Sequence, residues 1–311
     1  MANLLEVGVA FEIFGFSVKW YGIIIATGVL VAVLVACHNA KIKNYAKDFP
    51  YEILLWCFPL AIIGARLYYI IFSGESYTFA EAIAIWNGGM AIYGGIIGGL
   101  IGLVIFSLVK KHSLLKITDL VAPSLIIAQS IGRWGNFANQ EVYGTVVTNP
   151  DLQWFPFSVY IEKLGEWHYA TFFYESMICL VGFIILMFLF RKVKLGGIVT
   201  SAYLIIYGVE RFFLEGLREP TEILFIGNSN IAVSQVVSIG FVLAGVALLT
   251  AILILNRRKN IAIEKVDKVE ENSTQNENNE HNNEETSELE KDKNIQSTNI
   301  GENEIEKSND I

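Results

Sequence analysis

Seven long apolar stretches constrain this chain more than any other feature of its sequence. Each is long enough to cross the hydrocarbon core of a bilayer as an α-helix, which takes about 20 residues. They occupy residues 20–37, 53–72, 89–109, 114–131, 171–190, 198–214 and 231–255. Composition agrees, since only 17% of the 311 residues are charged, whereas soluble domains carry about 25%. We therefore predict an all-α polytopic membrane protein with seven transmembrane helices.

The basic residues between these stretches predict the orientation of the chain. The connections that follow the first, third, fifth and seventh stretches hold 12 basic residues, and the opposite connections hold only Lys19, Lys163 and Arg218. Cytoplasmic loops of membrane proteins are enriched in Lys and Arg. We therefore expect the N-terminus outside and the C-terminus in the cytoplasm, with residues 140–169 forming a small extracytoplasmic cap.

The C-terminal segment differs from the rest of the chain. Residues 256–311 hold 8 basic and 15 acidic residues, whereas residues 1–255 hold 15 and 16. A segment rich in Asn, Glu and Ser cannot bury enough apolar surface to fold. We predict a membrane domain over 1–259 and a disordered, acidic, polar cytoplasmic tail over 260–311. The body has no basic patch interleaved with aromatic residues, which argues against nucleic acid as a partner.

Cysteine and histidine spacing indicates neither a disulfide framework nor a metal site. The three cysteines lie within apolar stretches, and the four histidines are scattered. We expect no metal and no cofactor.

Charged residues within or beside the apolar stretches are candidates for a functional site, because a charge at the bilayer centre costs about 2.5–3.5 kcal/mol. They are Arg66, Asp119, Arg133, Glu175, Glu210 and Arg211. For Asp119 and Glu210, internal ion pairing that only holds helices together is an equal alternative.

Depth in the membrane gives a second, independent indication. The predicted topology places six polar residues from six helices in the outer half of the membrane. They are Tyr21, Arg66, Tyr93, Arg133, Glu175 and Arg211. The guanidinium group donates paired hydrogen bonds to phosphate or carboxylate and stays charged. Three arginines at this depth indicate an anionic lipid as substrate or ligand.

One motif is highly specific. Residues 132–141 read GRWGNFANQE, which resembles the GRxGNFxNxE signature of the bacterial prolipoprotein diacylglyceryl transferases. Residues 20–22, 64–69, 88–95, 174–176 and 207–220 resemble other segments of that family in the same order, as does Asp119, fourteen residues before Arg133. The resemblance extends over about residues 15–258 and leaves out the tail.

The resemblance implies an enzyme of the bacterial plasma membrane whose site faces the outer leaflet. It would transfer diacylglyceryl from phosphatidylglycerol to the lipobox cysteine of a prolipoprotein, giving a thioether and glycerol phosphate. Its partners would be phosphatidylglycerol, prolipoprotein signal peptides with a lipobox cysteine, and the bilayer. The nucleophile would be the thiol of the substrate, so the enzyme needs no nucleophilic side chain of its own.

The resemblance also implies roles for individual residues. Catalytic roles would belong to Arg133, Arg211, Tyr93 and Glu141. Substrate-binding roles would belong to Tyr21, Arg66, Asn136, Asn139, Glu175, Tyr207, Glu215 and Arg218. The two catalytic arginines would bind phosphate beside the two asparagines, and the glutamates at 141 and 215 would orient the arginines or the headgroup. The tyrosines at 21 and 207 would donate hydroxyl hydrogen bonds, or serve only as aromatic residues at the membrane interface.

Two positions depart from the family. Tyr93 stands where relatives often carry His, and Tyr, with a pKa near 10, is a poor general base. Either Tyr93 only orients the substrate or another group accepts the proton. Tyr169 and Ala170 stand where relatives carry His-Pro, and His168, one position away, is expected to be a polar residue at the interface.

Two other functions remain compatible with the sequence. A seven-helix transporter or receptor for an anionic ligand would have a similar topology, although the sequence shows no convincing internal repeat of the kind that transporters contain. Another lipid-headgroup enzyme, such as a phospholipase, would release free diacylglycerol.

Overall fold

The computed structural model describes residues 8–13, 16–227, 229 and 231–262. The chain divides into two compact units, Met1–Ile252 and Leu253–Ile311. The predicted tail lies outside the described residues except for its first three positions. All the candidate site residues belong to the first unit.

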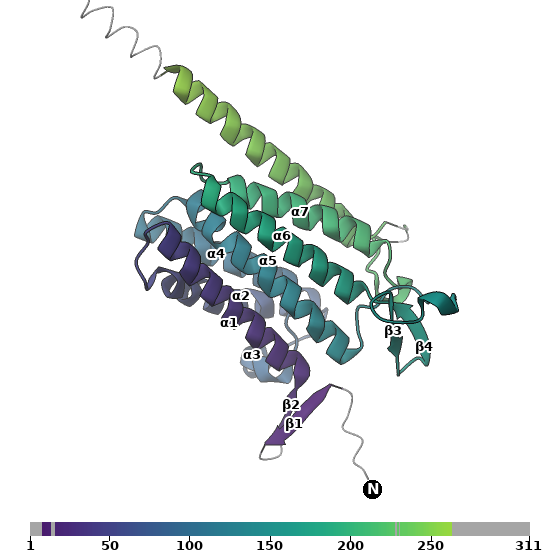
Figure 1. The fold of residues 1–311 in the computed structure, drawn as a ribbon. Helices are drawn as coiled ribbons and strands as arrows, with labels where there is room; N and C mark the ends of the chain where they lie inside the picture. The colour runs from purple at the N-terminus through teal and green to yellow at the C-terminus, as the bar shows by residue number, and fades with distance from the viewer. Residues whose placement is uncertain (1–7, 14–15, 228, 230, 263–311) are drawn as a thin grey trace, which may run out of the picture. The chain divides into compact units, whose positions relative to one another are not determined.

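In the described part of the chain, seven long helices form where the sequence predicts them (Figure 1). They are α1 (Trp20–Ile42), α2 (Phe49–Phe72), α4 (Ile92–Lys110), α5 (Leu114–Asn139), α6 (Thr171–Lys192), α7 (Ile198–Glu215) and a C-terminal helix, Val233–Ala262. Among the described residues, six of these helices are long and apolar enough to cross a membrane. The exception is α7, because it carries Glu210, Arg211 and Glu215 within 18 residues. The prediction of an all-α polytopic membrane protein is confirmed.

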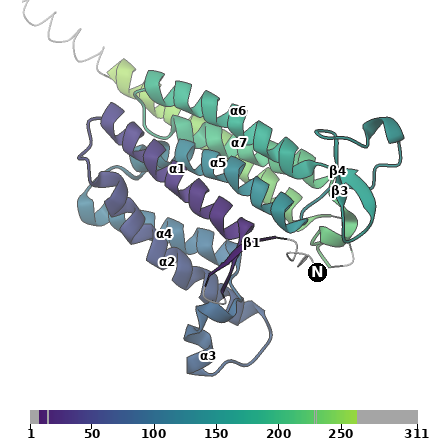
Figure 2. The ribbon, with the colours of Figure 1, turned by 60° about the horizontal axis from the view of Figure 1, so that its bottom comes forward.

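Helix α5 is the centre of the first unit. It packs against α1, α6 and α7, while α2 packs against α4, and Figure 2 shows α5 beside α1 and α6. Its residues Ile117, Leu120 and Ile126 are completely buried. Because α5 has neighbours on several sides, polar side chains near its end can meet side chains from α6 and α7.

Glycines bring α2 and α4 into close contact, as the Gly-rich third stretch predicts. A Cβ added to Gly98 would lie 2.1 Å from the carbonyl oxygen of Leu60, and one added to Gly94 would lie 2.2 Å from that of Gly64. No side chain fits at either position without separating the two helices.

Asp119 joins two helices, and it forms no ion pair with the residues that the structure describes. Its carboxylate accepts hydrogen bonds from the main-chain N–H groups of Gly197, at 2.7 Å, and Thr200, at 2.8 Å. These groups belong to the start of α7, where a helix favours negative charge. Asp119 is therefore a structural residue, but through helix capping rather than the ion pairing considered from the sequence.

The remaining elements are short and lie in the connections. They are β1 (Val9–Ile13), β2 (Phe16–Lys19), α3 (Phe79–Ile83), η1 (Ile85–Asn87), η2 (Pro150–Leu152), β3 (Ser158–Ile161), β4 (Glu166–Tyr169) and η3 (Pro220–Glu222). Strands β1 and β2 form one antiparallel hairpin, and β3 and β4 form another within the predicted cap. His168 of β4 is buried, with Nδ1 2.7 Å from the carbonyl oxygen of Gly144. His168 is therefore a buried residue of this hairpin, and its expected place at the membrane interface stays a prediction.

One end of the bundle gathers the polar residues that the sequence places at one depth. The first two turns of α1, α4 and α6 and the last two turns of α2, α5 and α7 carry them. They are Tyr21, Arg66, Tyr93, Arg133, Glu175 and Arg211. The β3–β4 hairpin lies at this same end of the bundle, near the C-terminus of α5 (Figure 1).

Candidate active site

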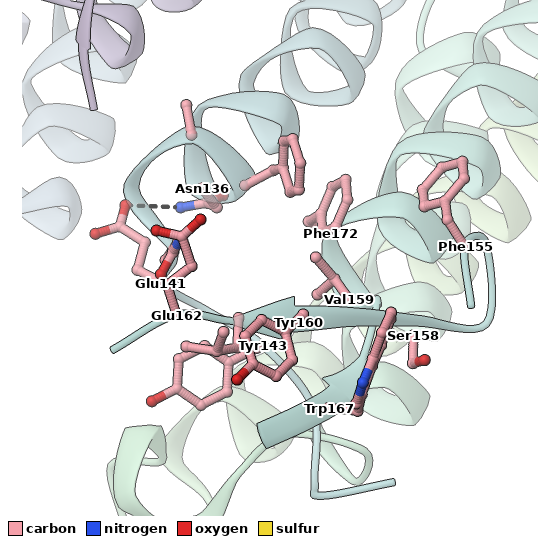
Figure 3. A pocket seen from close by; sticks show the side chains of 14 residues that line it. Asn136, Glu141, Tyr143, Phe155, Ser158, Val159, Tyr160, Glu162, Trp167 and Phe172 are labelled. Carbon is pink, nitrogen blue, oxygen red and sulfur yellow. Dashed lines mark hydrogen bonds between the residues drawn. The ribbon is translucent and has the colours of Figure 1, made fainter. Parts of the chain in front are cut away.

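The run 132–141 forms the last two turns of α5 and the bend after them. Gln140 ends the helix in the left-handed conformation, with φ of 51°, and its N–H donates to the carbonyl of Phe137. The chain then turns back, so that Glu141 Oε1 accepts a hydrogen bond from Asn136 Nδ2 at 3.0 Å (Figure 3). It accepts a second one from Asn139 Nδ2 at 3.5 Å. The side chains of the two asparagines therefore hydrogen-bond to Glu141. Among the described residues they form no hydrogen bond to an arginine.

Tyr21 lies beside this run. A Cβ added to Gly135 would lie 2.9 Å from Cδ2 of the Tyr21 ring. The absence of a side chain at Gly135 thus lets the first turn of α1 approach α5. The Tyr21 ring therefore packs against Gly135, the residue that precedes Asn136.

A pocket of about 470 Å³ opens beside the same helix end (Figure 3). Its walls come from the end of α5, from β3 and from the first turn of α6. The lining residues are Asn136, Phe137, Ala138, Gln140, Glu141, Tyr143, Phe155, Ser158, Val159, Tyr160, Ile161, Glu162, Trp167 and Phe172. The pocket is mainly aromatic and apolar, with carboxylates at Glu141 and Glu162.

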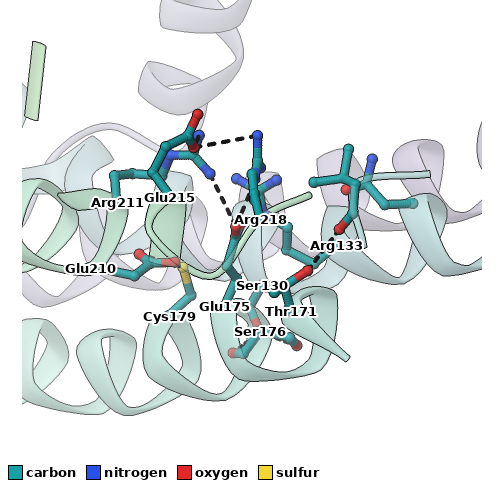
Figure 4. Close-up of polar contacts among 12 residues, drawn as sticks. Ser130, Arg133, Thr171, Glu175, Ser176, Cys179, Glu210, Arg211, Glu215 and Arg218 are labelled. Atoms are coloured by element: carbon teal, nitrogen blue, oxygen red, sulfur yellow. Dashed lines mark hydrogen bonds and ion pairs between the residues drawn. The ribbon is translucent and has the colours of Figure 1, made fainter. Parts of the chain in front are cut away.

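Three arginines surround one buried carboxylate (Figure 4). Glu175, in the second turn of α6, is completely buried. Its Oε2 pairs with Nε of Arg133 from α5. Its Oε1 lies 3.0 Å from Nη1 of Arg211 and 3.3 Å from Nη2 of Arg218. Side chains from α5, α6, α7 and the segment after α7 thus meet at one point.

A second carboxylate joins the cluster. Glu215 Oε2 lies 2.8 Å from Nη2 of Arg211 and 3.4 Å from Nη1 of Arg218, because residues three and four positions apart face the same side of a helix end. We call Arg133, Glu175, Arg211, Glu215 and Arg218 the arginine cluster. Its three guanidinium groups and two carboxylates leave one positive charge in excess, and its arginine side chains are 11–19% exposed.

The arginine cluster keeps hydrogen-bond donors for a further anion. Among the described residues, Arg218 Nε has no hydrogen-bond partner although it is buried, and Arg133 forms its ion pair through Nε, which leaves its two terminal amino groups. Burial lowers the pKa of Arg218, and the neighbouring Arg211 lowers it further, while Glu175 and Glu215 raise it. An added anion would relieve the cost of burying this charge.

Hydrogen bonds between α5 and α6 fix the position of the arginine cluster. Ser130 Oγ donates to the carbonyl of Ser176 at 2.8 Å, and Trp134 Nε1 donates to Ser176 Oγ at 3.1 Å. These residues flank Arg133 on one helix and Glu175 on the other. Neither Ser130 nor Trp134 is predicted for this role, because nothing in the sequence pairs them with Ser176.

Glu210 lies apart from the arginine cluster's ion pairs. It is buried, and Cys179 Sγ donates to its Oε2 at 3.3 Å. Within the described residues Glu210 forms no ion pair, so the ion pairing considered from the sequence is not what holds it.

Arg66 lies elsewhere at this end of the bundle. It donates to four main-chain carbonyls, those of Glu81 at 2.6 Å, Ala82 at 3.0 Å, and Gly88 and Gly89, both at 2.8 Å. Arg66 thus holds the segment between α2 and α4 in place. Its predicted role in substrate binding stays a prediction.

Two tyrosines of the predicted site also lie outside the arginine cluster. Tyr93, at the start of α4, is 40% exposed, and its ring centroid lies 6.3 Å from that of Tyr68. Tyr207 of α7 stacks on Tyr203, with ring centroids 5.9 Å apart and planes 9° apart. Their roles toward a substrate stay predictions.

Comparison with known proteins decides the family. The family model described as prolipoprotein diacylglyceryl transferase matches residues 8–251. The chain belongs to the prolipoprotein diacylglyceryl transferase family. This match confirms the resemblance that the sequence shows over about residues 15–258, and it supports a transferase rather than a transporter or receptor.

Similar proteins carry the same description. A phosphatidylglycerol–prolipoprotein diacylglyceryl transferase 1 of Clostridium perfringens is 43% identical over 262 residues, covering 82% of this chain and 98% of the relative. The corresponding transferase of Listeria innocua is 42% identical over 247 residues, covering 78% and 88%. That of Finegoldia magna is 44% identical over 243 residues, covering 77% and 93%. In this diacylglyceryl transferase family member, the GRWGNFANQE run therefore supplies both Arg133 and the Asn136–Glu141 hydrogen bond.

Proposed function

We propose that this chain transfers the diacylglyceryl group of phosphatidylglycerol to the lipobox cysteine thiol of a prolipoprotein. The observation that carries the proposal is the arginine cluster, which has one excess positive charge and unused guanidinium donors. It occurs in a chain whose relatives are named for phosphatidylglycerol and prolipoprotein.

The phosphate of the lipid binds at the donors that the arginine cluster leaves free. Arg133 is the most exposed of the three arginines, at 19%, and its terminal amino groups form a planar fork suited to two phosphate oxygens. Arg218 Nε supplies a further donor. Glu175 and Glu215 hold the guanidinium groups in place, so that they need not reorganise when charge develops.

The reaction is a displacement at carbon. The cysteine sulfur forms a bond to the terminal glycerol carbon of the diacylglyceryl group, and the bond from that carbon to the phosphate oxygen breaks. Its electron pair leaves with the oxygen, which gives a thioether and glycerol phosphate. Negative charge thus accumulates on the phosphate, where fixed donors in a water-poor site stabilise the transition state.

The thiol must also lose its proton, since a thiolate is the nucleophile and a free thiol has a pKa near 8.5. The excess positive charge of the arginine cluster favours the thiolate. Tyr93 orients the substrate through its hydroxyl group, and Glu141, held by two asparagine amides, contacts the glycerol headgroup.

The site faces the outer leaflet of the bacterial plasma membrane. Support comes from the 12 basic residues on one set of connections against three on the other, because basic loops stay in the cytoplasm. A cysteine introduced at 110–116 should then react with an impermeant reagent only from the cytoplasm, and one at 155–165 only from outside. Labelling from the opposite sides would overturn this orientation.

One reaction tests the function. The purified protein is incubated with phosphatidylglycerol vesicles and a lipobox peptide, and the peptide is measured by mass spectrometry. Addition of one diacylglyceryl group is the expected result, and a peptide whose cysteine is replaced by serine is the control. Free diacylglycerol with an unmodified peptide would indicate a phospholipase and refute the proposal.

A further inference from the structure

Strand β3 is an edge strand. It pairs with β4 in antiparallel register, from Ser158 opposite Tyr169 to Ile161 opposite Glu166. On its other side, β4 forms an antiparallel β-bridge between His168 and Val146. Within residues 8–13, 16–227, 229 and 231–262, no strand or bridge pairs with the outer side of β3. Such an edge presents main-chain N–H and C=O groups that can pair with another chain.

The pocket runs along this edge. Residues 158–162 line it without a gap, whereas β4 contributes only Trp167. Successive side chains of a strand point to opposite faces, so a pocket against one face would be lined by every second residue. A continuous lining indicates that the pocket follows the strand's edge, with the end of α5 as its opposite wall (Figure 3).

The main-chain groups of Tyr160 point away from β4. The carbonyl of Ile161 accepts from the N–H groups of Leu164 and Gly165, in the turn toward β4, and the carbonyl of Phe157 accepts from Ala170. Odd-numbered residues of β3 therefore direct their main-chain groups toward β4. Main-chain groups alternate between the two edges of an antiparallel strand, which leaves those of residue 160 for the pocket side.

We propose that the extended segment of the prolipoprotein beside its cysteine binds in this pocket as an additional strand on β3. This inference rests on the proposed function. Pairing through the main chain gives affinity, and pockets for alternate side chains give selectivity. The prolipoprotein is the occupant that the geometry favours, because the pocket adjoins the arginine cluster.

The pocket and the arginine cluster lie at the same end of α5. Asn136 lines the pocket and lies three residues after Arg133 on α5, a rise of about 4.5 Å along the helix axis. A peptide paired with β3 therefore lies against the same end of α5 that carries the arginine proposed to bind the phosphate. At the other end, Lys163 Nζ donates to the carbonyl of Asn139 at 3.4 Å and joins the hairpin to α5.

The side chains of the pocket give it a preference. Phe137, Phe172 and Tyr160 form apolar walls, and Tyr160 is 46% exposed. Glu141 is held by asparagine amides and is assigned to the glycerol headgroup, so the carboxylate left to face a peptide is that of Glu162. A strand with small or apolar residues toward α5 and no acidic residue near Glu162 fits this lining.

Methylated peptides test the strand pairing without changing the protein. Lipobox peptides are N-methylated at one main-chain amide at a time, and kcat and KM for the peptide are measured by mass spectrometry. Only every second N–H of an added strand points to β3. We expect KM to rise roughly 2- to 13-fold, the loss of one hydrogen bond, at alternating positions, with kcat at saturating peptide nearly unchanged.

A protein variant tests the same edge. Tyr160→Pro removes the N–H that faces the pocket and spares the pairing with β4, whereas Tyr160→Ala removes the side chain and keeps that N–H. We expect Tyr160→Pro to raise KM for the peptide more than Tyr160→Ala does, and to leave KM for phosphatidylglycerol unchanged. Thermal melting of both variants checks the fold.

The outcomes separate this inference from the function on which it rests. Lipidation with no alternation along the peptide refutes strand pairing and leaves the transferase proposal intact. A rise in KM for phosphatidylglycerol, with KM for the peptide unchanged, would show that the pocket holds lipid. That result would also refute strand pairing by the peptide. Failure of the unmodified protein to lipidate any peptide overturns both proposals.

Discussion

Replacing Arg133 by Lys tests how the arginine cluster acts on the phosphate. Arg133 uses Nε to pair with Glu175 and keeps two terminal amino groups for the substrate. Arg133→Lys preserves the positive charge and loses the planar fork. Loss of one donor to a developing oxyanion costs about 2.7–4 kcal/mol, a rate loss of about 10²–10³. We expect a loss of this size in kcat.

The fold should survive this substitution, because Glu175 keeps its contacts with Arg211 at 3.0 Å and Arg218 at 3.3 Å. The assay is the initial rate of peptide lipidation at equal protein level, with thermal melting as a check of stability. Arg191→Lys is the matched control, since Arg191 is exposed at the far end of α6 and should tolerate the change. If Arg133→Lys retained most of the original rate, phosphate binding by the fork would be refuted.

Three other changes to the chain have expected outcomes. Tyr93→Phe should slow lipidation only about 2- to 13-fold, the worth of one hydrogen bond, and near-complete loss with partial rescue by Tyr93→His would instead make Tyr93 the proton acceptor. Gly98→Ala should lower stability by about 1–3 kcal/mol through overpacking, because its Cβ would lie 2.1 Å from the carbonyl oxygen of Leu60. Gly99→Ala, with its nearest atom 3.8 Å away, is the control in a thermal melt and should be nearly neutral. Deletion of residues 264–311 should leave lipidation unchanged, since every residue of the proposed site precedes them, and lost activity at a normal protein level would contradict this.

Much of the fold follows directly from the sequence. An apolar run of about 20 residues has few alternatives to a membrane helix, since lipid offers no partners for main-chain groups. Helix α7 shows the limit of that reasoning. Its three charges exclude it from the apolar helices, and only the structure shows that Arg211 and Glu215 pair with each other and with residues of other segments.

The sequence predicts which residues belong to the candidate site better than it predicts which atoms they contact. The sequence names Arg133, Glu175 and Arg211 as residues of similar depth, and the structure brings them together. The sequence could not show that Arg66 donates its hydrogen bonds to main-chain carbonyls and lies outside the arginine cluster. Depth along a helix follows from residue number, whereas the direction in which a side chain points depends on packing between distant segments.

The pocket beside β3 was also beyond the sequence. Residues 158–161 form too short a run for periodicity to distinguish a strand from a loop. The pocket arises because the chain turns at Gln140 and returns past the end of α5. Such a long-range arrangement leaves no local signal.

The central claim is that phosphate is the leaving group of a displacement at carbon, and an isotope experiment tests it most directly. Phosphatidylglycerol is labelled with ¹⁸O at the oxygen that joins the diacylglyceryl carbon to phosphorus, and both products are analysed by mass spectrometry. Displacement at carbon breaks the bond on the lipid side of this oxygen. We predict that the label leaves with glycerol phosphate while the peptide gains an unlabelled diacylglyceryl group. Label retained on the lipid product would show cleavage at phosphorus and contradict the claim.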